Sequence, residues 1–101
     1  YNRYIGLYME IDKTMTRSVY DYINVCGYEL SSIEKKRDKT LKGSDIVLIL
    51  MMDLKKRRNH AEILSEVSQL EGVHYLEEVK FILLKSKVSH FLPKIYVYVR
   101  T

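Results

Sequence analysis

This chain of 101 residues contains one cysteine, one proline, four glycines and no tryptophan. A single cysteine, Cys26, allows no intrachain disulfide and no cysteine zinc cluster, which fits a reducing compartment. The four glycines, Gly6, Gly27, Gly43 and Gly72, are scattered and match no phosphate-binding loop. These shortages exclude a disulfide-stapled scaffold and the common nucleotide-binding fingerprints.

Long apolar runs are missing as well. The longest, Ile46 to Met52, is bounded by Asp45 and Asp53 and is far shorter than the ~20 apolar residues that span a bilayer. No secretory signal pattern opens the chain. The sequence begins at Tyr1 without a methionine, so we expect it to be a piece of a longer protein.

Apolar residues make up 47% of the chain, an ordinary share for a globular protein, and the length suits one domain with one core. The net charge of +4 comes largely from two basic clusters, residues 35–37 and 55–58. This charge is mild, because many domains without a polyanionic partner are equally basic.

The first half of the chain predicts a strand, a helix and a second strand. Apolar and polar residues alternate over residues 4–11, and helical apolar spacing follows from Met15 to Cys26, with Gly27 placed to end the helix. We expect Cys26 to be a small buried hydrophobe on that apolar stripe. Residues 28–34 predict a strand interrupted by a bulge.

The second half repeats this order. The run from Ile46 to Met52 is apolar on both faces and predicts a central strand, reached through a polar loop. A helix beginning after Asn59 and ending at Gly72 leads into a fourth strand at residues 73–79.

Side chains at the two helix starts predict their caps. Asp12 or Thr14 could cap the first helix. Asn59, followed three residues later by Glu62, resembles a capping box at the second.

The order strand, helix, strand, strand, helix, strand predicts an α+β, ferredoxin-like βαββαβ fold. Right-handed crossovers then give an antiparallel sheet with the first and third strands central and both helices on one face. We assign residues 1–79 to this domain and residues 80–101 to a C-terminal extension.

The extension leaves several placements open. Residues 81–84 could prolong the fourth strand, and residues 95–99 alternate tyrosine with β-branched residues, which favours an added strand. That strand could pair with a sheet edge, cover the open face, or be exchanged with a neighbouring copy.

A central strand that is apolar on both faces needs a cover on the side away from the helices. Because tyrosine is enriched at interfaces, we predict a self-association face on that side and a homo-oligomer. Its residues are Tyr8, Val47, Ile49 and Met51.

The basic run Lys55, Lys56, Arg57 and Arg58 stands just before a predicted helix start, where the helix dipole disfavours positive charge. It is a candidate contact for anionic lipid headgroups, nucleic acid or an acidic partner. A solvated loop is the simpler interpretation.

Tyr4, Tyr8, Tyr96 and Tyr98 could supply stacking faces for single-stranded nucleic acid. No match to the RNP1 motif accompanies them, so cover for the sheet or an interface is the preferred interpretation. A nucleic-acid-binding ferredoxin-like domain is the alternative function.

No catalytic constellation stands out, and we expect neither an enzyme nor a cofactor. His60, His74 and His90 lack zinc-site spacing and are interpreted as isolated surface residues. Six acidic residues near strand ends invite a divalent-cation site, but a solvated surface is the preferred interpretation. They are Glu10, Asp12, Asp45, Asp53, Glu77 and Glu78.

Two stretches resemble known families. Tyr4–Glu10 and Tyr28–Ile33 resemble an ACT-type regulatory domain. Ile46–Leu54, Asn59–Val67 and Leu70–Val73 are similar to the soluble C-terminal domain that follows the membrane helices in the MgtC/SapB family.

This resemblance, over about residues 4–79, implies a regulatory appendage on the cytoplasmic side of the cell membrane, belonging to a parent membrane protein linked to magnesium homeostasis. Amino-acid-binding ACT domains carry a glycine soon after the first strand, whereas residues 12–15 contain none. A bound amino acid is therefore not expected.

Overall fold

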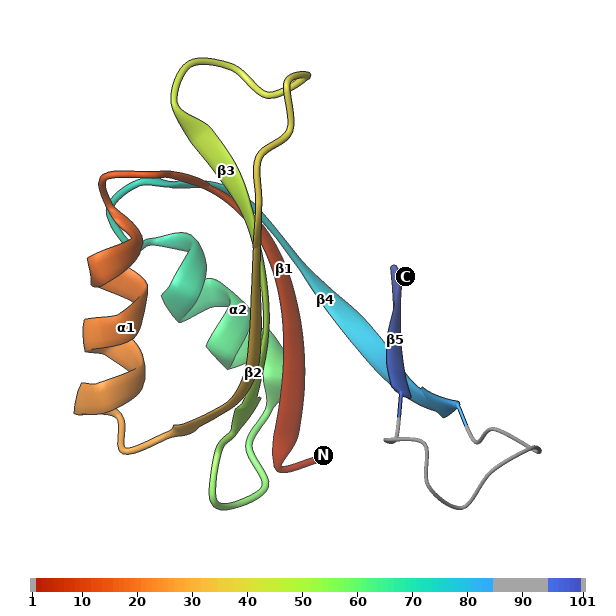
Figure 1. Ribbon diagram of the computed structural model, residues 1–101. Helices are drawn as coiled ribbons and strands as arrows, with labels where there is room; N and C mark the ends of the chain where they lie inside the picture. The colour runs from red at the N-terminus through yellow and green to blue at the C-terminus, as the bar shows by residue number, and fades with distance from the viewer. Residues whose placement is uncertain (1, 85–94, 101) are drawn as a thin grey trace.

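The computed structural model describes residues 2–84 and 95–100, which form one antiparallel sheet with two helices on one face (Figure 1). The strands are β1 (Tyr4–Asp12), β2 (Glu29–Lys36), β3 (Asp45–Asp53), β4 (Val73–Leu84) and β5 (Ile95–Arg100), and the helices are α1 (Thr16–Val25) and α2 (His60–Ser68).

The strands lie in the order β2-β3-β1-β4-β5. The first four, with α1 and α2 as crossovers, have the ferredoxin-like arrangement, and the predicted central position of the first and third strands is confirmed. β4 continues through residue 84, and β5 pairs with its outer edge, from Val79 opposite Arg100 to Leu84 opposite Ile95. Of the three placements open to the added strand, it takes the sheet edge.

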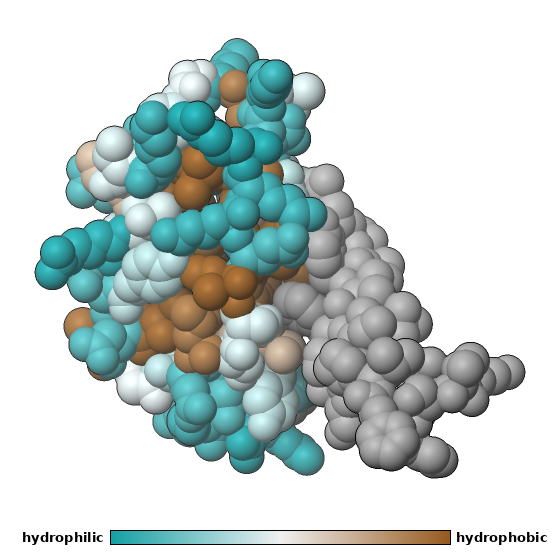
Figure 2. Space-filling model, in the orientation of Figure 1, coloured by the Kyte–Doolittle hydropathy of each residue, from teal (hydrophilic) through white to brown (hydrophobic). Residues whose placement is uncertain are grey.

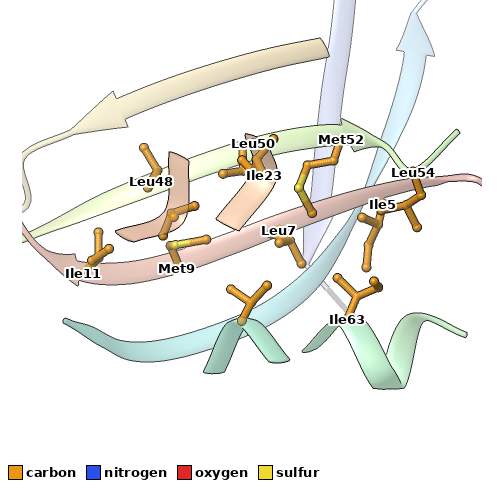
Figure 3. Close-up of a cluster of buried hydrophobic side chains, with 12 residues drawn as sticks. Ile5, Leu7, Met9, Ile11, Ile23, Leu48, Leu50, Met52, Leu54 and Ile63 are labelled. Atoms are coloured by element: carbon orange, nitrogen blue, oxygen red, sulfur yellow. The ribbon is translucent and has the colours of Figure 1, made fainter. Parts of the chain in front are cut away.

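The main core lies between the sheet and the helices. β1 and β3 pair over their whole length, so that Leu7 lies opposite Leu50, and their alternate side chains point towards α1 and α2 (Figure 3). The residues of this core are Ile5, Leu7, Met9, Ile11, Val19, Ile23, Leu48, Leu50, Met52, Leu54, Ile63 and Val67. The amphipathic pattern of each element therefore buries its apolar face here.

A second, smaller apolar cluster lies on the other face of the sheet. It consists of Tyr8, Val47, Ile49 and Val79, with Leu41 from the β2–β3 loop packed against it. The far half of β4 and the whole of β5 extend on this same side, away from the helices (Figure 1). On this face of β3, Val47 and Ile49 are therefore buried, whereas Met51 is half-buried.

Gly27 (φ +74°) is left-handed and directly follows the C-terminal cap of α1, as predicted. Gly72 (φ +88°) is left-handed as well, but the prediction that it ends the second helix is wrong, because α2 ends at Ser68 and Gly72 lies in the turn from Leu70 to Val73 that leads into β4. At the start of α2, the Asn59 side chain accepts a hydrogen bond from the Ala61 N–H at 2.9 Å, which confirms the predicted cap. The bulge predicted in β2 is confirmed by a register shift between Leu30 and Ser32.

Two predictions about α1 are wrong. The residue at its N-terminal cap is Met15, without a side-chain hydrogen bond, because the Asp12 carboxylate instead accepts from the N–H and hydroxyl of Thr14. At the other end Cys26 is exposed. The helix ends at Val25, so Cys26 no longer follows the buried stripe of Val19 and Ile23.

Candidate functional site

The basic run Lys55–Arg58 lies in the loop between β3 and α2, and its four side chains differ in their partners and exposure. Lys55 adopts a left-handed backbone (φ +68°), in which its N–H donates to the Asp53 carboxylate at 2.8 Å. Its ammonium group forms an ion pair with Glu29 and lies 3.9 Å from the same Asp53. Lys55 is thus neutralised by its own chain.

Arg58 is also paired with side chains of its own domain. Its guanidinium donates to the Tyr28 hydroxyl and lies 3.4 Å from the carboxylate of Glu62 and 3.3 Å from that of Glu66. The hydrogen bond to Tyr28 and the two carboxylates raise the pKa of Arg58 above its ordinary value. This arginine links Tyr28, the residue before β2, to α2.

Lys56 and Arg57 differ from both neighbours. Both are exposed, and within the described part of the chain neither side chain forms an ion pair or hydrogen bond. Together with Asn2, Arg3 and Tyr4 they line an open cleft of about 870 Å³. The structure therefore adds residues from the start of the chain to half of the predicted basic site.

Arg3 is held at the edge of this cleft by two contacts. Its Nη2 donates to the Asp53 carboxylate at 2.9 Å and to the Tyr4 hydroxyl at 3.0 Å, and its guanidinium lies 5.0 Å from the centre of the Tyr4 ring. Asp53 in turn is buried, and the N–H of Lys55 followed by Arg3 lowers the pKa of its carboxyl. One carboxylate thus fixes both sides of the cleft.

The sequence offered no signal for Arg3, because Arg3 and Asp53 are separated by 50 positions. A second hollow of about 360 Å³ lies beside the same loop, between Cys26, Tyr28 and Leu54, and Lys56 borders it as well.

The predicted self-association residues lie together on the open face of the sheet. Tyr8, Val47 and Ile49 are buried, and Met51 is half-buried. The Tyr8 ring meets Tyr75 edge to face, with centroids 6.1 Å apart. Self-association through this face stays a prediction; a partner would meet the residues around the cluster more than the cluster itself.

His74 lies at the surface, as expected, whereas His60 is half-buried, and each has an acidic partner that the sequence spacing did not reveal. His60 lies between the Glu78 carboxylate and the Asn2 carbonyl oxygen, each 2.8 Å from a ring nitrogen. His74 Nδ1 lies 2.7 Å from Asp45, which raises the pKa of His74 above its ordinary value. His90 lies outside the described residues.

The acidic residues do not gather. Asp53 is buried and Asp45 is largely so, which corrects their interpretation as solvated; strand pairing brings each a cationic or histidine partner. The Glu77 carboxylate accepts a hydrogen bond from the Tyr75 hydroxyl, and the Glu78 carboxylate contacts His60 on the helix side of the sheet. Among the residues that the structure describes, no group of three or more histidine, cysteine or acidic side chains could hold a metal ion.

The two edges of the sheet differ in sequence. β2 forms one edge and carries four charged residues and a bulge (Glu29, Glu34, Lys35, Lys36, and the shift between Leu30 and Ser32). In the view of Figure 2 the β2–β3 loop at the top and much of the β2 edge present hydrophilic residues. β5 forms the other edge, and its sequence is uncharged from Ile95 to Val99.

No family model, curated protein or solved structure matches this chain. Among the described residues, no helix is long and apolar enough to cross a membrane. The structure is an α+β domain with the ferredoxin-like order of elements, a basic cleft at one end and a sheet edge that is uncharged from Ile95 to Val99.

Proposed function

We propose that this domain is a non-catalytic regulatory or interaction module that acts by self-association, and that the outer edge of β5 is the surface through which two copies meet. Antiparallel pairing of β5 with β5 of a second copy would join two five-stranded sheets into one of ten strands. The observation that carries this proposal is the contrast between the two sheet edges.

An edge strand exposes unpaired N–H and C=O groups and invites another strand to pair with it. Proteins that stay monomeric block such edges with charges, prolines or bulges, and β2 has charges and a bulge. β5 has neither over Ile95–Val99, and its alternating tyrosine and valine residues favour strand pairing. Among the described residues no further strand covers it.

The edge of β5 can pair with the same edge of a second copy, so that one surface serves both partners. An antiparallel pair of identical strands has two-fold symmetry, which is the commonest symmetry of soluble homo-oligomers. The same geometry would bring the open faces of two sheets side by side, so that Met51 and its neighbours flank a continuous surface.

The experiment is the solution mass of the full chain by light scattering, for the wild type and for Val97→Lys. We expect a dimer for the wild type and a monomer for the variant, because a charge in the middle of the edge opposes pairing. Ser32→Lys is the matched control, since it adds the same charge to the edge formed by β2 and should leave the mass unchanged.

A chain ending at Leu84 gives an independent test, because it lacks β5 altogether. If this shortened chain is folded by circular dichroism and still dimeric, the β5 edge is not the interface, and the predicted face at Tyr8, Val47, Ile49 and Met51 takes its place. A monomeric wild type contradicts self-association itself.

The finer identity belongs to the same proposal. The resemblance described above supports an ACT-like C-terminal domain of an MgtC-type membrane protein, placed on the cytoplasmic side of the membrane and linked to magnesium homeostasis. An antibody against this domain should then detect a longer polypeptide in the membrane fraction of the source cells. Detection of a short polypeptide in the soluble fraction alone would contradict this identity.

A further inference from the structure

We propose that the cleft lined by Arg3, Tyr4, Lys56 and Arg57 is a binding site for a phosphate group. This inference is independent of self-association, because the cleft belongs to the β3–α2 loop and the start of the chain and not to the β5 edge.

The first step in the argument is charge. Three cationic side chains border the cleft, and within the described part of the chain Lys56 and Arg57 have no anionic partner. Both stand within three residues of the N-terminal cap of α2 at Asn59, where the helix dipole makes positive charge unfavourable. A bound anion would remove that cost.

The second step is rigidity. Asp53 accepts from the Lys55 N–H at 2.8 Å and from Arg3 at 2.9 Å, so a single buried carboxylate fixes the loop on one side and the arginine on the other. The same contact holds Lys55 in a left-handed backbone conformation, immediately before Lys56 and Arg57. Arg3 uses Nη2 for both of its hydrogen bonds, which leaves the donors on Nε and Nη1 for a ligand.

The third step is the choice of ligand. Guanidinium groups match the oxygens of phosphate with paired hydrogen bonds, and a dianion suits several cations better than a single carboxylate does. An extended nucleic-acid strand needs a basic groove that follows several phosphates. Here the neighbouring cations Lys55 and Arg58 are already paired with Glu29, Glu62 and Glu66.

A phosphate group of this kind can come from a soluble phosphorylated molecule or from a lipid headgroup. The test is therefore run with two probes on the full chain: sodium pyrophosphate, and phosphatidylcholine vesicles that contain phosphatidic acid. Amide chemical shifts of Lys56 and Arg57 in ¹H–¹⁵N spectra report the first, and co-sedimentation against pure phosphatidylcholine vesicles reports the second.

We expect saturable binding of at least one probe, weakened about tenfold or more in Lys56→Ala/Arg57→Ala, since charge-assisted hydrogen bonds to two cations are lost. Lys39→Ala/Lys42→Ala is the matched control: it removes the same charge from the β2–β3 loop, at the opposite end of β3 (Figure 1). Its binding should stay within about twofold of the wild type if the site is local.

A response to pyrophosphate identifies a soluble ligand, and a response to the vesicles alone identifies a headgroup. Absence of both, or an equal loss in the control, overturns the phosphate site. Binding of a single-stranded oligonucleotide without either response overturns it too, in favour of the nucleic-acid alternative.

Discussion

Gly72 shows how closely the two halves of the fold approach each other. A Cβ atom at this position would lie 2.3 Å from Cβ of Met15, at the start of α1, and the Gly72 carbonyl accepts from the Asp12 N–H at 2.9 Å. The first crossover and the second are therefore in direct contact at the end of β1.

Gly72→Ala should lower the free energy of unfolding by about 1–2 kcal/mol for the left-handed backbone and about 1–3 kcal/mol more for the clash. Gly43→Ala is the control, because Gly43 has a similar φ of +62° but open space around its Cβ position. Urea unfolding of both variants measures the difference. Equal losses would mean that the contact with Met15 relaxes without cost.

His74 is a histidine whose pKa is shifted by a partner that the fold brings to it. The hydrogen bond that His74 donates to the Asp45 carboxylate, together with the charge of that carboxylate, raises the pKa of His74 above the ordinary 6.5. A histidine whose pKa is raised on folding contributes stability that is fully present below its unfolded pKa and is lost as pH rises through its folded pKa.

The histidine ring protons of His74 should accordingly titrate in NMR with a midpoint above 6.5, and Asp45→Asn should return the midpoint towards that value. Asp38→Asn, in the β2–β3 loop and bonded to Thr40, is the control and should leave the midpoint unchanged. A midpoint insensitive to Asp45→Asn contradicts the pairing.

At the scale of elements, the two helices begin in different ways. α2 has a side-chain cap in Asn59, whereas the cap residue of α1, Met15, forms no side-chain hydrogen bond. The start of α1 depends instead on the packing of Met15, Val19 and Ile23. Local signals in the sequence therefore define the start of α2 better than the start of α1.

Asn59→Ala should cost about 1 kcal/mol of unfolding free energy, because the Ala61 N–H loses its acceptor. Asn24→Ala, at an exposed position of α1, removes the same side chain without a cap and should cost nothing measurable. Thermal unfolding of the two variants gives the comparison; similar losses would show that the cap is not the cause.

Strand β3 carries apolar residues on both faces, and on the face away from the helices the depth of burial changes along the strand. Ile49 is 3% exposed on the side away from the helices, while Met51 on the same side is half-buried. The difference makes this strand a test of the second apolar cluster.

Ile49→Lys should lower the free energy of unfolding by about 2–5 kcal/mol, as for removal of a buried isoleucine. Met51→Lys should lower the free energy of unfolding clearly less, because Met51 is half-buried and the long lysine side chain can reach water with its ammonium group. Denaturant unfolding measures both. If Ile49→Lys is as stable as the wild type, the open face of the sheet is uncovered in solution.

At the scale of the whole molecule, one edge strand of the sheet, β2, carries four charged residues, whereas the other, β5, is uncharged from Ile95 to Val99. If copies pair through β5, the dimer is favoured by mass action and the folded state gains stability as concentration rises. The midpoint of thermal unfolding should then increase with protein concentration for the wild type. The midpoint for Val97→Lys should be independent of concentration, and a wild-type midpoint that does not change contradicts the dimer.

Periodicity in the sequence was sufficient to predict the order of elements, because each strand and helix buries one side against a common core. The apolar run of β3 placed that strand at the centre, and Gly27 and Asn59 marked helix ends through preferences that act locally. Gly72 is four residues beyond the end of α2, because its left-handed backbone serves the turn into β4. The prediction that Cys26 is buried was wrong because α1 ends at Val25, so the helical spacing does not continue to Cys26.

Pairings between distant residues were decided by the tertiary structure alone. His74 meets Asp45 across 29 positions and Arg3 meets Asp53 across 50, and both contacts exist because β3 is paired with β1 beside β4. The same folding divides the basic run, neutralising Lys55 and Arg58 and leaving Lys56 and Arg57 at a cleft. Local preferences of the sequence determine the helices and strands. The ion-pair and hydrogen-bond partners of charged side chains depend on strand order and register, which are set only by the tertiary structure.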